Sequence, residues 1–144
     1  MKVLEEHKRI KYVEGKHSDK ILEIIVYQRN KEIAQIHGIY HTLGNGVKVF
    51  NFDTAMVYKE EDRRKGVGTH LMRIAEQEAK KRGVDAILLI DVSSKEGREL
   101  SKKCGYKMLE KKVSLKGISI DGYKIFTEHH VKLDFIKRML KIKK

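Results

Sequence analysis

The stretch Arg63-Arg64-Lys65-Gly66-Val67-Gly68-Thr69 decides the fold, because it stands directly before a segment with helical periodicity. The apolar residues of that segment fall on one helical face: Leu71, Met72, Ile74, Ala75 and Ala79. Gly83 then predicts the end of the helix. A helix begins with amide groups that lack partners within the helix and with a partial positive charge. Glycines there let the backbone approach an anion closely, so the stretch predicts a pyrophosphate site.

Other phosphate-binding loops fit this stretch less well. The nucleotide-binding P-loop motif, Gly-x-x-x-x-Gly-Lys-Ser/Thr, does not occur. A dinucleotide-binding fingerprint needs a third glycine where this chain has Leu71. A purely structural reading stays open, in which the glycines form a tight strand-to-helix turn and the basic residues a solvated loop.

Upstream of this stretch the sequence predicts an antiparallel meander of three strands. The strands are expected at residues 21–27, 32–42 and 47–58, where β-branched and aromatic residues gather. Asn30-Lys31 is expected to form the first turn, and Gly44-Asn45-Gly46 is a strong hairpin signal.

Downstream, the apolar run at residues 86–92 predicts a strand covered on both faces. Ser93-x-x-Glu96 reads as a capping box that opens a second helix, which ends at Gly105. Two strands are expected near residues 108–115 and 123–133, with a turn at Asp121-Gly122. This order predicts an α/β domain built on one mixed sheet.

Composition limits the classes of function. The 144 residues fit one domain, 1–144, with 40% hydrophobic residues and a net charge of +12 that favours anionic ligands. Cys104 is the single cysteine, which excludes an internal disulfide and a zinc site of paired cysteines. No stretch resembles a signal peptide or a membrane span, so we expect a cytoplasmic protein without metal. No aromatic-interleaved basic motif supports RNA binding.

The order of these elements resembles that of the GNAT superfamily of N-acetyltransferases. It consists of a strand, the motif Arg-x-x-Gly-x-Gly, a helix, a strand and a second helix that ends in Gly-aromatic. The resemblance covers about residues 47–133 and implies a three-layer α/β domain with a mixed, mostly antiparallel central sheet. It also implies acetyl-CoA as cosubstrate, with the amides of residues 64–69 on the pyrophosphate and the backbone of residues 56–58 on the pantetheine arm. The cofactor contacts implied are Met56, Val57, Tyr58, Arg63, Arg64, Lys65, Gly66, Val67, Gly68, Thr69 and Ser94.

At the catalytic groups this chain departs from the family pattern. Many members carry a tyrosine where this chain has Ser101, and a serine hydroxyl is a poor general acid. Water or Cys104 could replace it, although Cys104 reads better as a core residue. Asp53 is the nearest candidate for a general base, provided that a strand bulge aims it correctly; otherwise it is a rim carboxylate. His37, His41, His129 and His130 read as ordinary histidines.

The N-terminal region is short and lacks room for the two helices that usually wall the acceptor site of this family. We therefore expect an open groove that suits a macromolecular amine, such as a lysine or an N-terminal amine of a protein. The basic amphipathic tail, residues 134–144, is expected to pack on the domain as a helix. The protein is expected as a monomer or a homodimer. Two alternatives remain: a non-catalytic acyl-CoA-binding regulatory domain, and a basic nucleic-acid-binding protein.

Overall fold

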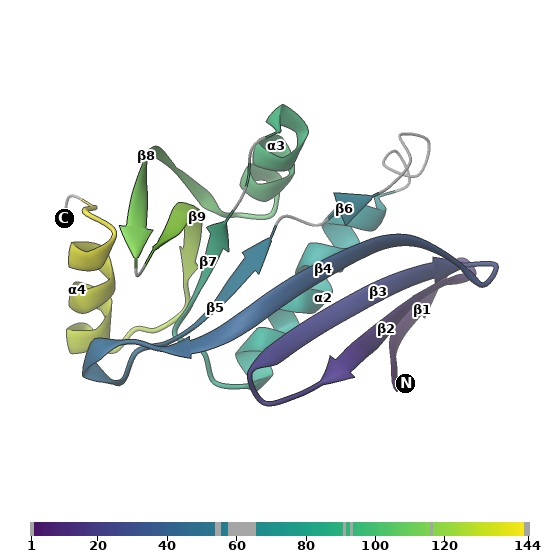
Figure 1. Ribbon diagram of the computed structural model, residues 1–144, viewed down its shortest axis with the longest axis horizontal. Coiled ribbons are helices and arrows are strands. Elements are labelled where there is room, and N and C mark those ends of the chain that lie inside the picture. The colour runs from purple at the N-terminus through teal and green to yellow at the C-terminus, as the bar shows by residue number, and fades with distance from the viewer. Residues whose placement is uncertain are drawn as a thin grey trace.

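The computed structural model describes residues 2–53, 56–57, 66–90, 92, 94–115 and 117–142. Figure 1 shows one twisted sheet, with helix α2 along one side of β3 and β4 and helix α4 at the end of the molecule away from β1. The elements in chain order are β1 (Lys2–His7), β2 (Ile10–His17), β3 (Ile21–Gln28), β4 (Lys31–Thr42), the 3-10 turn η1 (Gly44–Gly46), β5 (Lys48–Asp53), β6 (Met56–Val57), α2 (Val67–Lys81), β7 (Ala86–Ile90), α3 (Lys95–Lys103), β8 (Lys107–Leu115), β9 (Ile118–Ile125) and α4 (His130–Met139).

The sheet has the strand order β1-β2-β3-β4-β5-β7-β9-β8, and β6 pairs with β4. Only one pairing among the described strands is parallel, that of β5 with β7, and α2 makes the crossover between them. All other pairings are antiparallel. The expectation of a mixed, mostly antiparallel sheet is therefore confirmed.

Two apolar clusters separate the layers. The larger cluster joins α2 to one face of the sheet, where Leu71 and Ala79 of the helix meet Ile24 and Phe50 of the strands. The smaller cluster lies on the other face, over β5, β7 and β9, and includes Ile136 of α4. The three layers are thus as expected from the sequence, and the terminal helix packs on the domain but begins at His130 instead of at residue 134.

The N-terminal half of the sheet is covered on one side only. Residues 2–53 contain no α-helix, so the two helices that the sequence lacks room for are absent from this part of the chain. In β3, Leu22, Ile24 and Val26 face α2 and are fully buried, whereas their neighbours Ile21 and Ile25 are only half-buried. In the described part of the chain, α2 thus covers one side of β2–β4, and no helix covers the second side. We call that side, turned away from α2, the open face.

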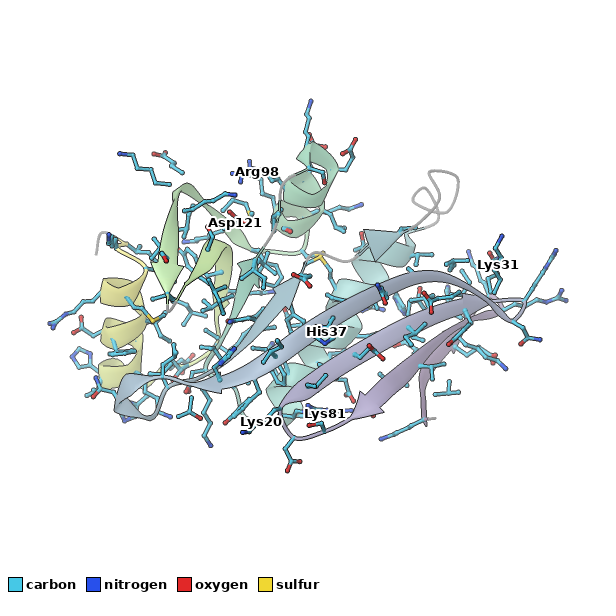
Figure 2. The ribbon with its side chains drawn as sticks, in the orientation of Figure 1. Lys20, Lys31, His37, Lys81, Arg98 and Asp121 are labelled. Carbon is cyan, nitrogen blue, oxygen red and sulfur yellow. The ribbon has the colours of Figure 1, made fainter. Side chains whose placement is uncertain are left out.

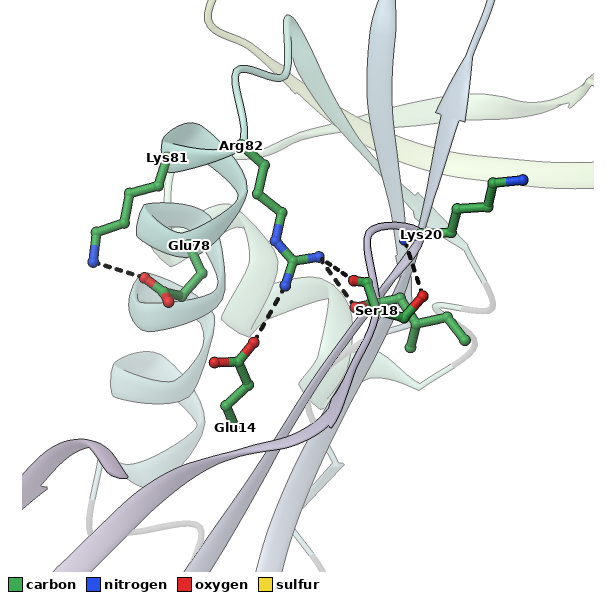
Figure 3. A network of polar contacts seen from close by, with 7 residues as sticks. Glu14, Ser18, Lys20, Glu78, Lys81 and Arg82 are labelled. Atoms are coloured by element: carbon green, nitrogen blue, oxygen red, sulfur yellow. Dashed lines mark hydrogen bonds and ion pairs between the residues drawn. The ribbon is translucent and has the colours of Figure 1, made fainter. Parts of the chain in front are cut away.

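Arg82 ties the end of α2 to the loop between β2 and β3 (Figure 3). Its Nη1 atom donates to the backbone oxygens of Ser18 and Ile21, at 3.2 and 3.1 Å. Its Nη2 atom lies 3.3 Å from Oε1 of Glu14, a carboxylate that is 7% exposed. Because the carboxylate is buried, loss of the guanidinium would cost more stability here than at the protein surface.

The first hairpin was not predicted from the sequence. Its two strands, β1 and β2, meet at a turn formed by Lys8 and Arg9, both with positive φ. The next turn lies one residue before the expected position, because Arg29 and Asn30 take the positive φ values. Neither turn contains a glycine, which is the usual sequence signal for this backbone conformation.

The predicted C-terminal strand at residues 123–133 is wrong. Asp121 and Gly122 lie inside β9 instead of forming a turn, and the chain reverses before it, where Gly117 has a φ of +81°. A Cβ on Gly122 would lie 2.7 Å from Sδ of Met108, so this glycine permits close packing of β8 on β9. After β9 the chain forms α4, and His129 caps that helix instead of lying in a strand.

Candidate functional site

The N-terminus of α2 has the features of an anion site. Gly66 is the N-cap residue and takes a left-handed conformation, φ +75° and ψ 10°. The first intrahelical bond runs from the amide of His70 to the oxygen of Gly66, so the amides of Val67, Gly68 and Thr69 precede the helical ladder. The first turn holds no acidic side chain that would repel an anion. Helix polarity and these amides together can hold a phosphate group.

The two glycines of this turn serve different purposes. Within the part of the chain that the structure describes, a Cβ on Gly66 would meet no atom closer than 4 Å, so its need for glycine is the positive φ. A Cβ on Gly68 would lie 3.1 Å from Cδ2 of Leu100 and 3.6 Å from Cγ2 of Val57. Gly68 therefore lets α2, α3 and β6 meet at this corner, while Gly66 leaves space beside the turn.

The strands diverge next to this corner. β5 pairs with β7 up to Asp53 and Ile90, and the following strand β6 pairs with β4 at Gln35. Among the described residues, β6 has no strand pairing with β7. We call the point where the pairing of β5 with β7 ends, at Asp53 and Ile90, the apex of the splay.

The register of β4 differs by one residue between its pairing with β5 and its pairing with β6. From the pair Gly38–Phe52 to the pair Gln35–Met56, β4 advances three residues and the opposing chain four. Phe52 faces α2, and Asp53 pairs with Ile90, which packs on the α4 side. Asp53 therefore points to the face opposite α2, as the alternation of the strand predicted, and it is half-buried.

The start of α3 forms the second wall of this corner. Ser94 is its N-cap, and the Ser94 hydroxyl accepts from the amide of Gly97 at 3.0 Å. The cap is thus one residue later than the Ser93 box predicted. Ser101 is fully buried, and its hydroxyl donates to the oxygen of Gly97 at 2.8 Å. This hydroxyl is therefore engaged inside its own helix.

Cys104 also lies on the α2 side of the sheet, half-buried against the larger apolar cluster. Burial raises the pKa of its thiol, and the positive charge of Lys124 opposes that shift only in part. Lys124 donates to the oxygen of Cys104 at 3.0 Å and lies 2.7 Å from Oε1 of Glu76. The thiol is accordingly a core group beside an ion pair.

Other predicted site residues lie outside the described residues. These are Tyr58, Arg63, Arg64 and Lys65. Met56 and Val57 form β6 at the splay, as expected for a strand beside the pantetheine arm, and Val57 also packs in the larger cluster. The expected cofactor contacts stay predictions.

One residue that shapes the site was not recognised in the sequence. Asp121 is 1% exposed, and its Oδ2 atom accepts from the amide of Val92 at 2.8 Å. Nζ of Lys112 lies 3.5 Å from the other carboxylate oxygen. Asp121 thereby holds the segment that leads from β7 to α3. The pair Asp-Gly is typical of a turn, so the sequence predicted a turn here and not a contact with Val92.

A polar cluster joins β1 to the first turns of α2. Nε2 of His70 lies 2.5 Å from Oε1 of Glu5, and Nη2 of Arg73 lies 2.5 Å from Nδ1 of the same ring. The ring of Tyr12 packs on His70 at a centroid distance of 4.8 Å. Burial, and then the Glu5 carboxylate, raise the pKa of Tyr12 to about 12. This cluster fixes the edge strand to the helix.

The described residues carry neither a metal cluster nor a membrane-spanning helix. Among the described residues, no group of three or more His, Cys, Asp and Glu side chains could hold a metal ion. In the same part of the chain, no helix is both long and apolar enough to cross a membrane.

The comparisons with known proteins agree with this geometry. The model of the acetyltransferase (GNAT) family matches residues 4–106. Naa50 of Arabidopsis thaliana, solved with a bisubstrate analogue, is 16% identical over 72% of each chain, with a TM-score of 0.57. A GNAT-family acetyltransferase of Streptococcus pneumoniae is 14% identical over 76% of this chain and 69% of that chain, with a TM-score of 0.60. An acetyltransferase of Clostridium acetobutylicum, solved with acetyl-CoA, is 22% identical over 68% and 65%, with a TM-score of 0.57.

These structural likenesses are those of the fold, since the sequence identities are low. No curated protein matches the chain in a sequence search. The family model, in contrast, spans β1 to the end of α3 and includes both the start of α2 and the splay. Because it covers 103 of the 144 residues (4 to 106), the chain belongs to the GNAT family of acetyltransferases.

Proposed function

We propose that the protein transfers an acetyl group from acetyl-CoA to a primary amine, most suitably a lysine or N-terminal amine of a protein. The start of α2 is the observation that carries this proposal. Its left-handed Gly66, the amides of Val67 to Thr69 and the first turn without acidic side chains suit a diphosphate. This anion site adjoins β6, because a Cβ on Gly68 would lie 3.6 Å from Cγ2 of Val57.

The proposed cofactor contacts follow the path of an extended CoA molecule. The backbone of residues 64–69 would hold the pyrophosphate, with Arg63 and Lys65 adding positive charge. The chain at Met56, Val57 and Tyr58 would lie along the pantetheine arm, and Ser94 at the start of α3 would border it. The thioester would then lie near the apex, within reach of Asp53.

The acceptor class follows from the uncovered part of the sheet. The described residues 2–53 place no helix over the open face, so a large acceptor would be able to reach the apex from that side. Two structures that the chain resembles hold a peptide or an analogue of one: Naa50 with a bisubstrate analogue, and the NatC complex with Gag peptide and CoA. Aminoglycoside acetyltransferases also share the fold, so the fold alone does not choose the acceptor.

The chemistry needs no covalent intermediate on the protein. The free amine attacks the thioester carbon, and a tetrahedral intermediate forms, whose oxyanion a backbone amide near the splay would stabilise. The carbon–sulfur bond then breaks and CoA leaves as the thiolate, which takes the second proton of the amine. Asp53 is the proposed carboxylate on the acceptor side. Ser101 is the weaker candidate for the acid, because its proton is donated to Gly97.

Calorimetry with acetyl-CoA, followed by thiol release across a panel of amines, tests the proposal. We expect heat of binding from the wild-type protein, an affinity that Gly66→Ala weakens by tenfold or more, and thiol release that depends on the amine. Absence of binding heat with the wild-type protein would remove the proposal entirely.

The second candidate is a regulatory domain that binds acyl-CoA without transferring the acyl group. The engaged hydroxyl of Ser101 favours it, because this chain offers no tyrosine there. Binding of acetyl-CoA without thiol release for any amine would select this candidate.

Nucleic-acid binding rests only on the net charge of +12. The single-domain organisation of residues 1–144, the cytoplasmic location and the oligomeric state stay predictions.

A further inference from the structure

The open face carries a row of ionisable side chains that ends at the apex. His37 is half-buried in β4, and its register partner in β3 is Glu23. The antiparallel ladder of β4 with β5 ends at the pair Gly38–Phe52, and His37 and Asp53 are the next residues of the two strands, on the same face of the sheet. The order across the three strands is therefore carboxylate, imidazole, carboxylate.

All three side chains point away from α2. In β4 the neighbours Ile36 and Gly38 face the helix side, where Ile36 is 2% exposed and Gly38 lies against the ring of Phe52. His37 therefore faces the opposite side, and Figure 2 shows it on the side of β4 turned away from α2. On that side Gln35 and Ile39 flank it along the strand, and Ile39 is 40% exposed.

Glu23 forms the outer end of the row. A Cβ on Gly15 of β2 would lie too close to Oε1 of Glu23, so the carboxylate lies over this glycine. The row thus runs from the apex across β4 and β3 to a carboxylate at β2. Among the described residues, Glu23 and Asp53 are the ionisable groups that face His37 from the adjacent strands.

The side of the sheet from which the amine approaches decides which side chains can take its proton. An alkyl amine is protonated near pH 7 and must lose one proton before its nitrogen can attack a thioester. Helix α2 and the proposed pyrophosphate site occupy the other side of the sheet, so the amine reaches the apex over the open face. On the α2 side, Ser101 is fully buried and Cys104 packs in the core. The proton acceptor is therefore to be sought on the open face.

We propose that His37 takes the proton of the substrate ammonium group, which the Asp53 carboxylate attracts to the apex, and that the acceptor lies over the open face of β3 and β4. This inference rests on the proposed function and names the amine subsite of the same site. The ammonium gives one proton to the imidazole, which releases it to water beside Glu23. The nitrogen then forms its bond to the acetyl carbon, the carbon–sulfur bond breaks, and the second proton goes to the CoA thiolate.

His37→Gln is the variant that tests this assignment, because glutamine keeps hydrogen-bonding capacity but cannot take a proton. The matched control is His41→Gln, on the same strand and the same face but opposite Val49, away from the apex. The probes are a peptide with one lysine and a blocked N-terminus, a peptide with a free N-terminus, and spermidine. Thiol release is followed from pH 6 to pH 10, and acetyl-CoA binding is measured by calorimetry.

We expect His37→Gln to lower kcat near pH 7 by about 10²-fold, the usual effect of losing a general base, while the Kd for acetyl-CoA changes less than about twofold. The difference in kcat between His37→Gln and the wild type should become smaller toward pH 10, because much of the amine is already free base there. Added imidazole should restore part of the activity of His37→Ala. His41→Gln should keep the wild-type profile.

Two results would overturn the assignment of His37 alone. In one, His37→Gln turns over with the pH profile of the wild type; in the other, His41→Gln loses as much activity as His37→Gln. Failure of the wild-type protein to bind acetyl-CoA, or to release thiol with any of the three probes, would instead overturn the transferase function, and the role of His37 with it.

Discussion

Gly66 and Gly83 stand at the two ends of α2 with the same backbone conformation, φ +75°, and among the described residues a Cβ on either would meet no atom within 4 Å. Alanine at either position must adopt the left-handed region, at a cost of about 1–2 kcal/mol. We predict that Gly66→Ala and Gly83→Ala destabilise the protein equally in urea unfolding. Only Gly66→Ala should weaken CoA binding, by tenfold or more in calorimetry. Equal CoA affinities of the two variants would contradict the proposed site.

The pairing of Arg82 with Glu14 predicts a large loss of stability on mutation. Arg82→Ala leaves a buried carboxylate and two backbone oxygens without the guanidinium, which should lower the free energy of unfolding by about 3 kcal/mol. Lys81 is the matched control, because it is 74% exposed and pairs with Glu78 at 2.9 Å on the outer side of the helix (Figure 3). Lys81→Ala should change the free energy of unfolding by less than about 0.5 kcal/mol. Urea unfolding followed by circular dichroism measures both.

The central part of the fold could be predicted because its sequence signals are local. β4, α2 and β7 follow from apolar periodicity, and the glycines of η1 mark the hairpin between β4 and β5. The first hairpin could not be predicted, since Lys8 and Arg9 adopt positive φ without the glycine or asparagine that usually marks such a turn. Cross-strand pairing overrides the local preference there.

In the candidate site, too, only the features that depend on one local segment could be predicted from the sequence. The glycines before α2 were recognisable from the sequence alone, because their role depends on the backbone of one segment. Asp53, His37 and Glu23 lie far apart in the sequence, and only the register of three strands brings them into one row. Asp121 was read as a turn residue, although it holds the amide of Val92 across the sheet. Such roles depend on topology, which a single sequence does not specify.

Variants of the two serines of α3 should differ in effect: Ser101→Ala tests catalysis, and Ser94→Ala tests the stability of the helix. The Ser101 hydroxyl donates to Gly97 within the helix, so Ser101→Ala should leave kcat within about twofold of the wild type. Ser94 caps the same helix through the amide of Gly97, and Ser94→Ala should lower the free energy of unfolding by about 1 kcal/mol. Steady-state thiol release and urea unfolding measure the two effects. A large fall of kcat in Ser101→Ala, with acetyl-CoA binding intact, would restore the hydroxyl as the acid.

Tyr12 should make the stability of the protein depend on pH in the alkaline range. Its pKa is raised to about 12 by burial and then by Glu5, whereas a tyrosine of the unfolded chain titrates near 10. The folded state therefore retains the proton longer, and this contribution is complete below pH 10 and lost as the pH rises from about 10 to 12. In urea unfolding at pH 9, 10 and 11, Tyr12→Phe should lose less stability than the wild type. If the wild type and Tyr12→Phe lost the same stability as the pH rose, Tyr12 would ionise as freely in the folded protein as in the unfolded chain.

Cys104 should react slowly with thiol reagents and should be dispensable for transfer. Burial raises the pKa of its thiol, so the thiolate, which is the reactive form, is scarcer at pH 8 than in the unfolded chain. We expect a disulfide reagent such as dithionitrobenzoate to react at least tenfold more slowly with the native protein than with the protein in urea. Cys104→Ala should retain kcat within about twofold, because the thiol packs in the core on the α2 side. Rapid modification accompanied by loss of thiol release from acetyl-CoA would instead place this sulfur at the reacting centre, as the replacement for the missing tyrosine.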